Sequence, residues 1–202
     1  MKSILLMFSG GLDSLAALYL LLTDPKYAEY SIHVHHVEIV NKEWRHLAER
    51  IAVQSIFKYL KDNKYKDFDY SESSITVPAI GNNFLWDTDI TSFISGYISL
   101  YGNHIIAFGV NKDDLTRVNS RQMMRATSLF GSFSDPKRKL YPVSHLTKQE
   151  LYDLVPKELS DLSWSCRTPV LENNIWTKCK KCHTCIRLSL LRMPNYEPPT
   201  NS

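Results

Sequence analysis

A turn with two adjacent glycines lies near the start of the 202-residue chain, between a short apolar run and a stretch rich in Ala and Leu. It carries two hydroxyl side chains, Ser9 and Ser14, and one carboxylate, Asp13. Where a strand ends in glycines and a helix begins, bare backbone N–H groups and the helix dipole attract an anion. A carboxylate at this point serves either as a cap on neighbouring N–H groups or as a ligand for Mg²⁺. The turn is therefore a candidate phosphate-binding site.

The turn differs from two familiar phosphate-binding loops. It lacks the lysine that a Walker A loop requires, and its glycines are adjacent, unlike those of the G-x-G-x-x-G dinucleotide fingerprint. The letters SGGLDS at 9–14 instead resemble the SGGxDS signature of PP-loop enzymes, which bind ATP and release pyrophosphate when they adenylate a substrate. An ordinary strand-to-helix turn without a ligand is the alternative.

The chain's four cysteines are gathered in its C-terminal part with the spacing C-x12-C-x2-C-x2-C, as Cys166, Cys179, Cys182 and Cys185. Two successive Cys-x-x-Cys steps bring three thiolates together, and Cys166 returns across the loop as the fourth. This pattern predicts a closed, structural Zn²⁺ site, with His183 as the substitute ligand. An iron–sulfur cluster is the alternative, whereas a cytoplasmic setting disfavours disulfides.

Alternating strands and helices must position these two motifs. The sequence predicts strands at residues 4–8, 32–40, 74–77, 105–110 and 139–143. It predicts helices at residues 15–22, 43–60, 87–100, 120–129 and 147–155, the last with a capping box formed by Thr147 and Glu150. The alternation indicates an α/β fold with a parallel sheet covered on both faces. We expect residues 1–202 to form one domain, in which the segment at about 163–192 is an irregular, Cys-rich appendage.

Composition and charge limit the classes of protein to which this chain can belong. The chain has no apolar run of the roughly 18–20 residues that a membrane span needs, and its first apolar stretch lacks a cleavage site, so we expect a cytoplasmic protein without membrane contact. The net charge of +3 is too small to indicate nucleic-acid binding by itself. Arg117, Arg121 and Arg125 recur every four residues, so they share one face if the segment that contains them is a helix. That face is either solvated or in contact with an anionic substrate.

Together, the glycine turn and the cysteine cluster resemble those of the 7-cyano-7-deazaguanine synthase family. Similar motifs lie between the two, namely Arg45-His46-x-x-Glu49, Val77-Pro78, Gly109-Val110-Asn111 with Asp114, Thr147-Lys148-x-Glu150 and Trp164-Ser165-Cys166. The resemblance implies a Rossmann-like parallel sheet of PP-loop (adenine nucleotide alpha hydrolase-like) type with a C-terminal zinc-binding segment. It also implies a homodimer.

The resemblance further implies a reaction. ATP activates the carboxylate of 7-carboxy-7-deazaguanine, ammonia gives an amide, and a second activation gives 7-cyano-7-deazaguanine. ATP and its Mg²⁺ would be held by Phe8, Ser9, Gly10, Gly11, Leu12, Asp13, Ser14 and Leu15. Asp13, Ser14 and Arg121 would be the catalytic residues, with Arg121 against an anionic group, and the four cysteines would hold structural Zn²⁺.

Two segments, 79–83 and 115–121, depart from the family's pattern, and the second is expected to face the substrate. A related PP-loop enzyme that adenylates a deazaguanine or another acid and transfers it to a different amine is therefore one alternative. A non-catalytic zinc-knuckle protein that binds nucleic acid is the other, because residues 163–192 contain six Lys or Arg against one acid. This second alternative leaves the glycine turn without a purpose.

Overall fold

The computed structural model describes residues 2–77, 87–102, 104–117 and 120–191 of the chain. Five strands form one wholly parallel sheet in the order β3-β2-β1-β4-β5. Their bounds are β1 Ser3–Met7, β2 Ser31–Val40, β3 Asp69–Thr76, β4 His104–Phe108 and β5 Lys139–Leu140. The predicted α/β fold with a parallel sheet is confirmed.

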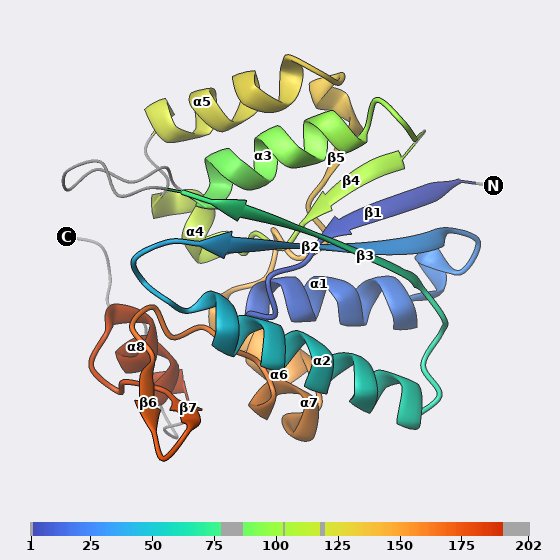
Figure 1. Ribbon diagram of the computed structural model, residues 1–202. Helices are drawn as coiled ribbons and strands as arrows, with labels where there is room; N and C mark the ends of the chain where they lie inside the picture. Colours follow the sequence, from blue (N-terminus) through green and yellow to red (C-terminus); the bar gives the residue numbers. More distant parts are fainter. Residues whose placement is uncertain (1, 78–86, 103, 118–119, 192–202) are drawn as a thin grey trace.

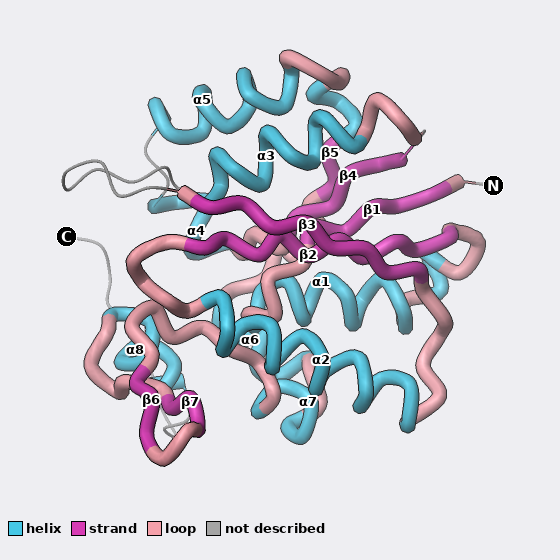
Figure 2. Tube along the Cα trace, in the orientation of Figure 1, coloured by secondary structure: helices cyan, strands magenta, loops and turns pink. Residues whose placement is uncertain are grey.

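Helices cover both faces of the sheet (Figure 1). The helices α1, α2, α6 and α7 lie on one face, and α3 and α5 lie on the other (Figure 2). The bounds are α1 Leu12–Thr23, α2 His46–Asp62, α3 Asp87–Ile98, α4 Lys112–Arg117, α5 Ser120–Gly131, α6 Lys148–Leu154 and α7 Lys157–Asp161, with short 3₁₀ turns η1 Pro25–Tyr27 and η2 Pro136–Arg138. Within the described residues, no helix has both the length and the apolar character needed to cross a membrane.

The side chains of β1 show how the sheet is buried on both faces. Ile4 and Leu6 belong to the larger apolar cluster, which includes α1 and α2, whereas Leu5 and Met7 belong to the smaller cluster with α3 and α5. None of the four is more than 6% exposed. Burial on both faces explains why this strand is an unbroken apolar run rather than an alternating one. The end of β1, where the glycine turn begins, is thus fixed by packing from two sides.

The strand order creates a switch point beside β1. The chain proceeds from β1 to β2 and β3 on one side, and it then returns to form β4 and β5 on the other side. The loops after β1 and β4 therefore diverge where these two strands end. In open parallel sheets, ligands bind in the crevice at this point.

Several elements differ from those predicted. The edge strand β3 starts at Asp69 rather than at residue 74, because its outer positions are exposed and mostly polar and give no apolar signal. The strand β5 is shorter than predicted, at Lys139–Leu140, and α2 starts at His46 rather than at residue 43. The helices α4 and α7 have six and five residues, too few to show a helical period. The capping box of α6 is confirmed, with both of its bonds present.

The C-terminal segment is more regular than expected. It contains an antiparallel hairpin of β6 Val170–Glu172 and β7 Ile175–Thr177, followed by the helix α8 His183–Leu191. Asn173 and Asn174 join the two strands with φ values of 49° and 63°. A two-residue turn with positive φ at both positions suits a hairpin, and Asn tolerates that conformation. The prediction of an irregular segment was therefore wrong for this part of the chain.

Candidate functional site

The glycine turn joins β1 to α1 and contains one residue in the left-handed region. Gly10 has a φ of 75°, and a Cβ there would lie 3.1 Å from the side chain of Val53. The Ser14 hydroxyl donates to the Gly11 carbonyl at 3.0 Å and accepts from the backbone N–H of Ser9 at 3.2 Å. These bonds close the turn and hold the first N–H groups of α1 at the end of the sheet, as an anion site requires.

The loop after β4 touches the glycine turn. A Cβ at Gly109 would lie 2.6 Å from the backbone N and Cα atoms of Ser14, so only glycine permits this approach. Asn111, two residues further along, is fully buried. The close contact at the switch point therefore brings the Asn111 amide beside Asp13.

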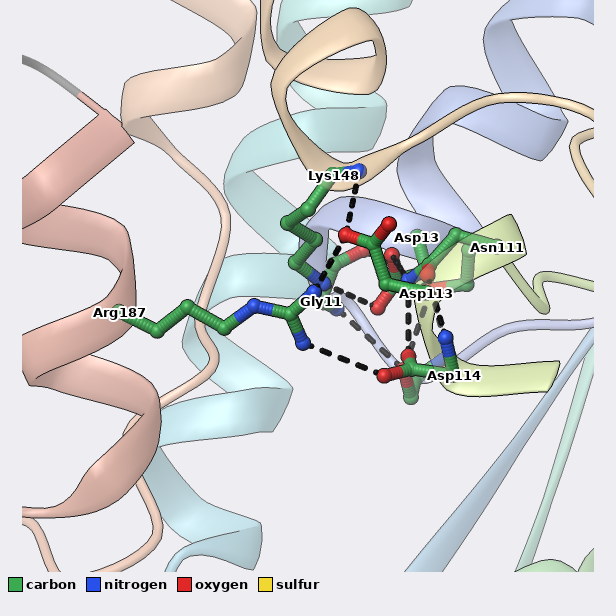
Figure 3. A network of polar contacts seen from close by, with 9 residues as sticks. Gly11, Asp13, Asn111, Asp113, Asp114, Lys148 and Arg187 are labelled. Carbon is green, nitrogen blue, oxygen red and sulfur yellow. Dashed lines mark hydrogen bonds and ion pairs between the residues drawn. The ribbon is translucent and has the colours of Figure 1, made fainter. Parts of the chain in front are cut away.

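Asp13 lies at the centre of a polar network (Figure 3). Its Oδ1 accepts a hydrogen bond from Asn111 Nδ2 at 2.7 Å, and its Oδ2 pairs with the ammonium of Lys148. The same Asn111 nitrogen donates to Asp114 at 2.7 Å. The N-cap of α1 is Gly11, and no side chain caps this helix end. Asp13 therefore bonds to side chains, and the capping role considered from the sequence does not apply.

Arg187, on α8, also reaches this network (Figure 3). Its guanidinium donates to Asp113 at 2.5 Å and to Asp114 at 3.2 Å. Asp113 also accepts from the backbone N–H of Lys148 at 3.0 Å. The network thus joins three carboxylates and two cations from four separate elements.

A second charged cluster surrounds Arg45, just before α2. Arg45 pairs with Glu43 at 2.8 Å, with Glu49 at 3.2 Å and with Asp87. Arg167, from the C-terminal segment, reaches Asp87 at 2.6 Å. Arg45 and Glu49 are only 8% and 7% exposed. The cluster therefore holds charge in surroundings with little water.

Burial and charge give two carboxyl groups of this cluster different properties. Burial raises the pKa of Glu49 to about 7, although Arg45 favours its ionised form. Burial by itself would also raise the pKa of Asp87, but Arg45 and Arg167 hold it below its ordinary value. Glu49 thus titrates near neutral pH while Asp87 stays ionised. A carboxyl group with such a shifted pKa in a cleft is typical of a functional site.

One cleft of about 500 Å³ joins the two clusters, a size that suits a small-molecule site. Its glycine-turn side is lined by Ser9, Gly11, Asp13, Ser14, Asp114, Lys148 and Arg187. Its Arg45 side is lined by Arg45, Glu49, Asp87 and Arg167. Apolar side chains of the strands, among them those of Met7, Val37, Ile39 and Phe108, also line it.

The four cysteines form a compact cluster beside the cleft. Their sulfur atoms all lie within 4.8 Å of one another, and those of Cys179 and Cys185 are 3.9 Å apart. The backbone N–H of Cys179 donates to the Cys166 sulfur at 3.3 Å, and that of Cys182 donates to the Cys179 sulfur at 3.3 Å. Four thiolates at this separation fit one tetrahedral metal ion. His183, the substitute ligand, lines the cleft instead.

The structure places the residues predicted for the ATP site in two different environments, the cleft and the apolar core. Phe8 lines the cleft together with the polar residues of the turn, whereas Leu12 and Leu15 are buried in the apolar core. Arg117 and Arg121 belong to α4 and α5, but their side chains lie outside the part of the chain that the structure describes. Their contact with an anionic group therefore stays a prediction.

Five residues of the polar network were not among the predicted site residues, namely Asn111, Asp113, Asp114, Lys148 and Arg187. Asn111 and Lys148 lie in motifs that carried the family resemblance, and that resemblance is the signal that could have identified them. Arg187 lies beyond the cysteine cluster, where its charge suggests only compensation of the thiolates. No pattern in the sequence indicates that it reaches Asp113 and Asp114.

No family model matches the chain, and no curated protein matches it in sequence. Among solved structures, it is similar to the U34-tRNA thiolase NcsA from Methanococcus maripaludis with its [4Fe-4S] cluster, with a TM-score of 0.56 and 14% identity. At this identity the similarity shows the fold alone, an α/β fold with a parallel sheet. The similarity covers 93% of this chain but 62% of that thiolase chain. The predicted fold class is thus confirmed.

Proposed function

We propose that this chain is an enzyme that binds ATP in the cleft and adenylates a substrate. The observation that carries the proposal is the glycine-turn side, where the start of α1, the hydroxyls of Ser9 and Ser14 and the Lys148 ammonium line one part of the cleft. Helix N–H groups, hydroxyls and an ammonium group are complementary to a triphosphate. The resemblance of SGGLDS to the PP-loop signature and the similarity of fold to a U34-tRNA thiolase support the same assignment.

In the proposed reaction, an oxygen atom of the substrate attacks the α-phosphorus of ATP. A new P–O bond forms while the bond from that phosphorus to pyrophosphate breaks, and the electron pair leaves with pyrophosphate. Lys148, Ser14 and the N-terminus of α1 stabilise the negative charge that develops on the phosphate oxygens. Asp13 and Asp114 offer the carboxylate oxygens that Mg²⁺ bound to ATP prefers.

For the substrate we propose 7-carboxy-7-deazaguanine, with ammonia as the nitrogen donor. The support is the motif resemblance, since Arg45, Glu49, Gly109 and Lys148 of those motifs line the cleft. Ammonia would displace AMP from the adenylated acid to give an amide. Adenylation of the amide oxygen, followed by loss of AMP and of two N–H protons, would give 7-cyano-7-deazaguanine.

The similarity to a tRNA thiolase favours a second candidate, the adenylation of a tRNA base. Sulfur insertion generally uses a reactive cysteine as carrier. All four cysteines of this chain belong to the cluster, so a carrier would have to leave it. Nitrile formation needs no cysteine, and we therefore favour it.

We propose that the cluster holds Zn²⁺ in a structural role. A Zn–S distance of about 2.3 Å places tetrahedral sulfurs about 3.8 Å apart, close to the 3.9 Å between Cys179 and Cys185. In a [4Fe–4S] cluster the thiolates bind different iron atoms and lie further apart. Metal analysis and the absorption spectrum of anaerobically purified protein distinguish the two. About one zinc per chain supports the proposal, and an iron–sulfur band contradicts it.

The test of function is a product assay with ATP, 7-carboxy-7-deazaguanine and ammonium. We expect release of pyrophosphate and a product with the mass of the nitrile. Formation of AMP without nitrile would indicate a different amine. Pyrophosphate release only with tRNA would favour the second candidate, and no release with either would refute adenylation of these substrates.

A further inference from the structure

The cysteine cluster and the start of α8 are one structural unit. Cys182 accepts, through its carbonyl, the backbone N–H of Ile186 at 3.0 Å, and its sulfur accepts the backbone N–H of Cys185 at 3.5 Å. One candidate metal ligand, Cys185, therefore lies in the first turn of this helix, and a second, Cys182, immediately precedes the helix. A metal ion held by them fixes the position and direction of α8.

Arg187 projects from α8 two residues after Cys185, and its side chain is 14% exposed. It bridges Asp113 and Asp114, and Asp114 shares the Asn111 amide with Asp13. A continuous series of contacts thus runs from α8, which carries Cys185, to the carboxylate of the glycine turn. Figure 3 shows its part from Arg187 to Asp13.

We infer that Arg187 is a positioning residue through which the metal-bound cysteine loop sets the affinity of the cleft for ATP. The inference rests on the proposed function. Asp13, Asp113 and Asp114 bring three negative charges to the network, and Lys148 and Arg187 bring two positive ones. Withdrawal of Arg187 raises the excess of negative charge in the network from one to two beside a triphosphate, and like charges repel. Loss of the contact with Arg187 also lets Asp114 compete with Asp13 for the hydrogen bond from the Asn111 amide.

A second route from the cysteine segment to the turn exists and must be separated from the first. The backbone N–H of Trp164 donates to the Gly10 carbonyl at 2.9 Å, and Trp164 precedes Cys166 by two residues. Metal loss could therefore disturb the turn without Arg187. Arg187→Ala with the metal in place removes only the first route.

The experiment measures ATP affinity by calorimetry for the wild type and for Arg187→Ala, each with its metal and after chelation. We expect chelation to weaken ATP binding about 10-fold or more in the wild type, the size of a lost charge-assisted hydrogen bond. Metal-loaded Arg187→Ala should already bind ATP about 10-fold more weakly, and chelation should add little. Lys181→Ala, which removes an exposed charge from the same loop, is the control and should bind ATP as the wild type does.

The outcomes are distinct. If metal-loaded Arg187→Ala binds ATP like the wild type, or if chelation weakens it by the same factor as the wild type, the inference is overturned and the second route carries the effect. If the metal-loaded wild type binds no ATP, the proposed function itself fails. Unchanged metal content and circular dichroism show that Arg187→Ala is folded, and Arg187→Lys should recover affinity only in part because an ammonium cannot bridge both carboxylates as a guanidinium does.

Discussion

The two sides of the cleft both carry charged residues, yet they balance the charges differently. On the glycine-turn side, Asp13 is shared between Lys148 and Asn111, so each of its carboxylate oxygens has one partner. On the Arg45 side, one guanidinium is shared among three carboxylates, and Glu49 keeps a pKa of about 7. The Arg45 side therefore contains a carboxyl group whose charge changes near neutral pH.

The difference follows from what builds each side. Strand ends, a glycine turn and a helix N-terminus define the glycine-turn side. These backbone features suit a ligand whose structure does not vary, such as a triphosphate. Side chains from α2, α3 and the C-terminal segment define the Arg45 side. A buried carboxyl group donates a hydrogen bond when it is neutral and accepts one when it is ionised. Such a group suits a side of the cleft that would bind the substrate to be adenylated.

The largest effect should come from Asp13→Ala on the glycine-turn side. The substitution leaves the buried Lys148 ammonium without its partner and removes a ligand proposed for Mg²⁺, so we expect pyrophosphate release to fall by about 100-fold or more. The control is Asp62→Ala, which breaks an exposed pair with Lys58 and should leave the rate within about twofold. Near-normal turnover of Asp13→Ala would place the nucleotide elsewhere.

Cys182→Ser should disturb both sides at once, because Arg167 and Arg187 both come from the cysteine segment. Structural zinc binds with roughly 10–16 kcal/mol in small peptides, more than many whole domains have in stability. We expect loss of the metal and rapid proteolysis within residues 163–191, while the sheet stays folded. Ser189→Ala, at an exposed position of α8, is the control. Retention of both the metal and protease resistance would contradict the assigned ligand set.

Glu49→Gln tests the titrating side by its pH dependence. The folded-state pKa of about 7 lies above the ordinary value of 4.5, so the folded protein holds this proton more tightly than the unfolded chain. The free energy of unfolding of the wild type should therefore fall as the pH rises from 4.5 to about 7, by on the order of 3 kcal/mol from this group. Urea unfolding across this range should show Glu49→Gln gaining stability relative to the wild type. If the unfolding free energies of the wild type and Glu49→Gln change with pH in parallel, Glu49 does not titrate as stated. Glu29→Gln, at an exposed position, is the control.

The smallest effect should come from Thr147→Ala, which removes the N-cap of α6 one residue before Lys148. Loss of a cap costs about 1 kcal/mol of stability, and the less firmly held lysine should raise KM for ATP by no more than about threefold. Thr147→Ser keeps the capping hydroxyl and should behave as the wild type. Equal effects of the two substitutions in thermal unfolding and ATP kinetics would show that the cap is unimportant.

Features that act through local backbone geometry could be predicted from the sequence. The glycine turn, the cysteine spacing and the Thr147 cap each lie within a short segment, and the structure places each as expected. The contacts of Arg187 with Asp113 and of Arg45 with Asp87 join residues 74 and 42 positions apart, and no local pattern encodes such pairs. The hairpin at Asn173 and Asn174 could have been expected from its turn residues, although its strands are too short to show alternation.

The central place of β1 also bears on how the chain folds. Ser3 pairs with His104 as well as with Ser31, so the middle of the sheet closes only when segments about a hundred residues apart have met. Such distant pairings must pay loop-closure entropy before they gain contacts, and chains that depend on them fold slowly. The approach of Gly109 to Ser14 requires this same pairing. The glycine turn therefore acquires its final shape late in folding, after the strands that flank it have docked.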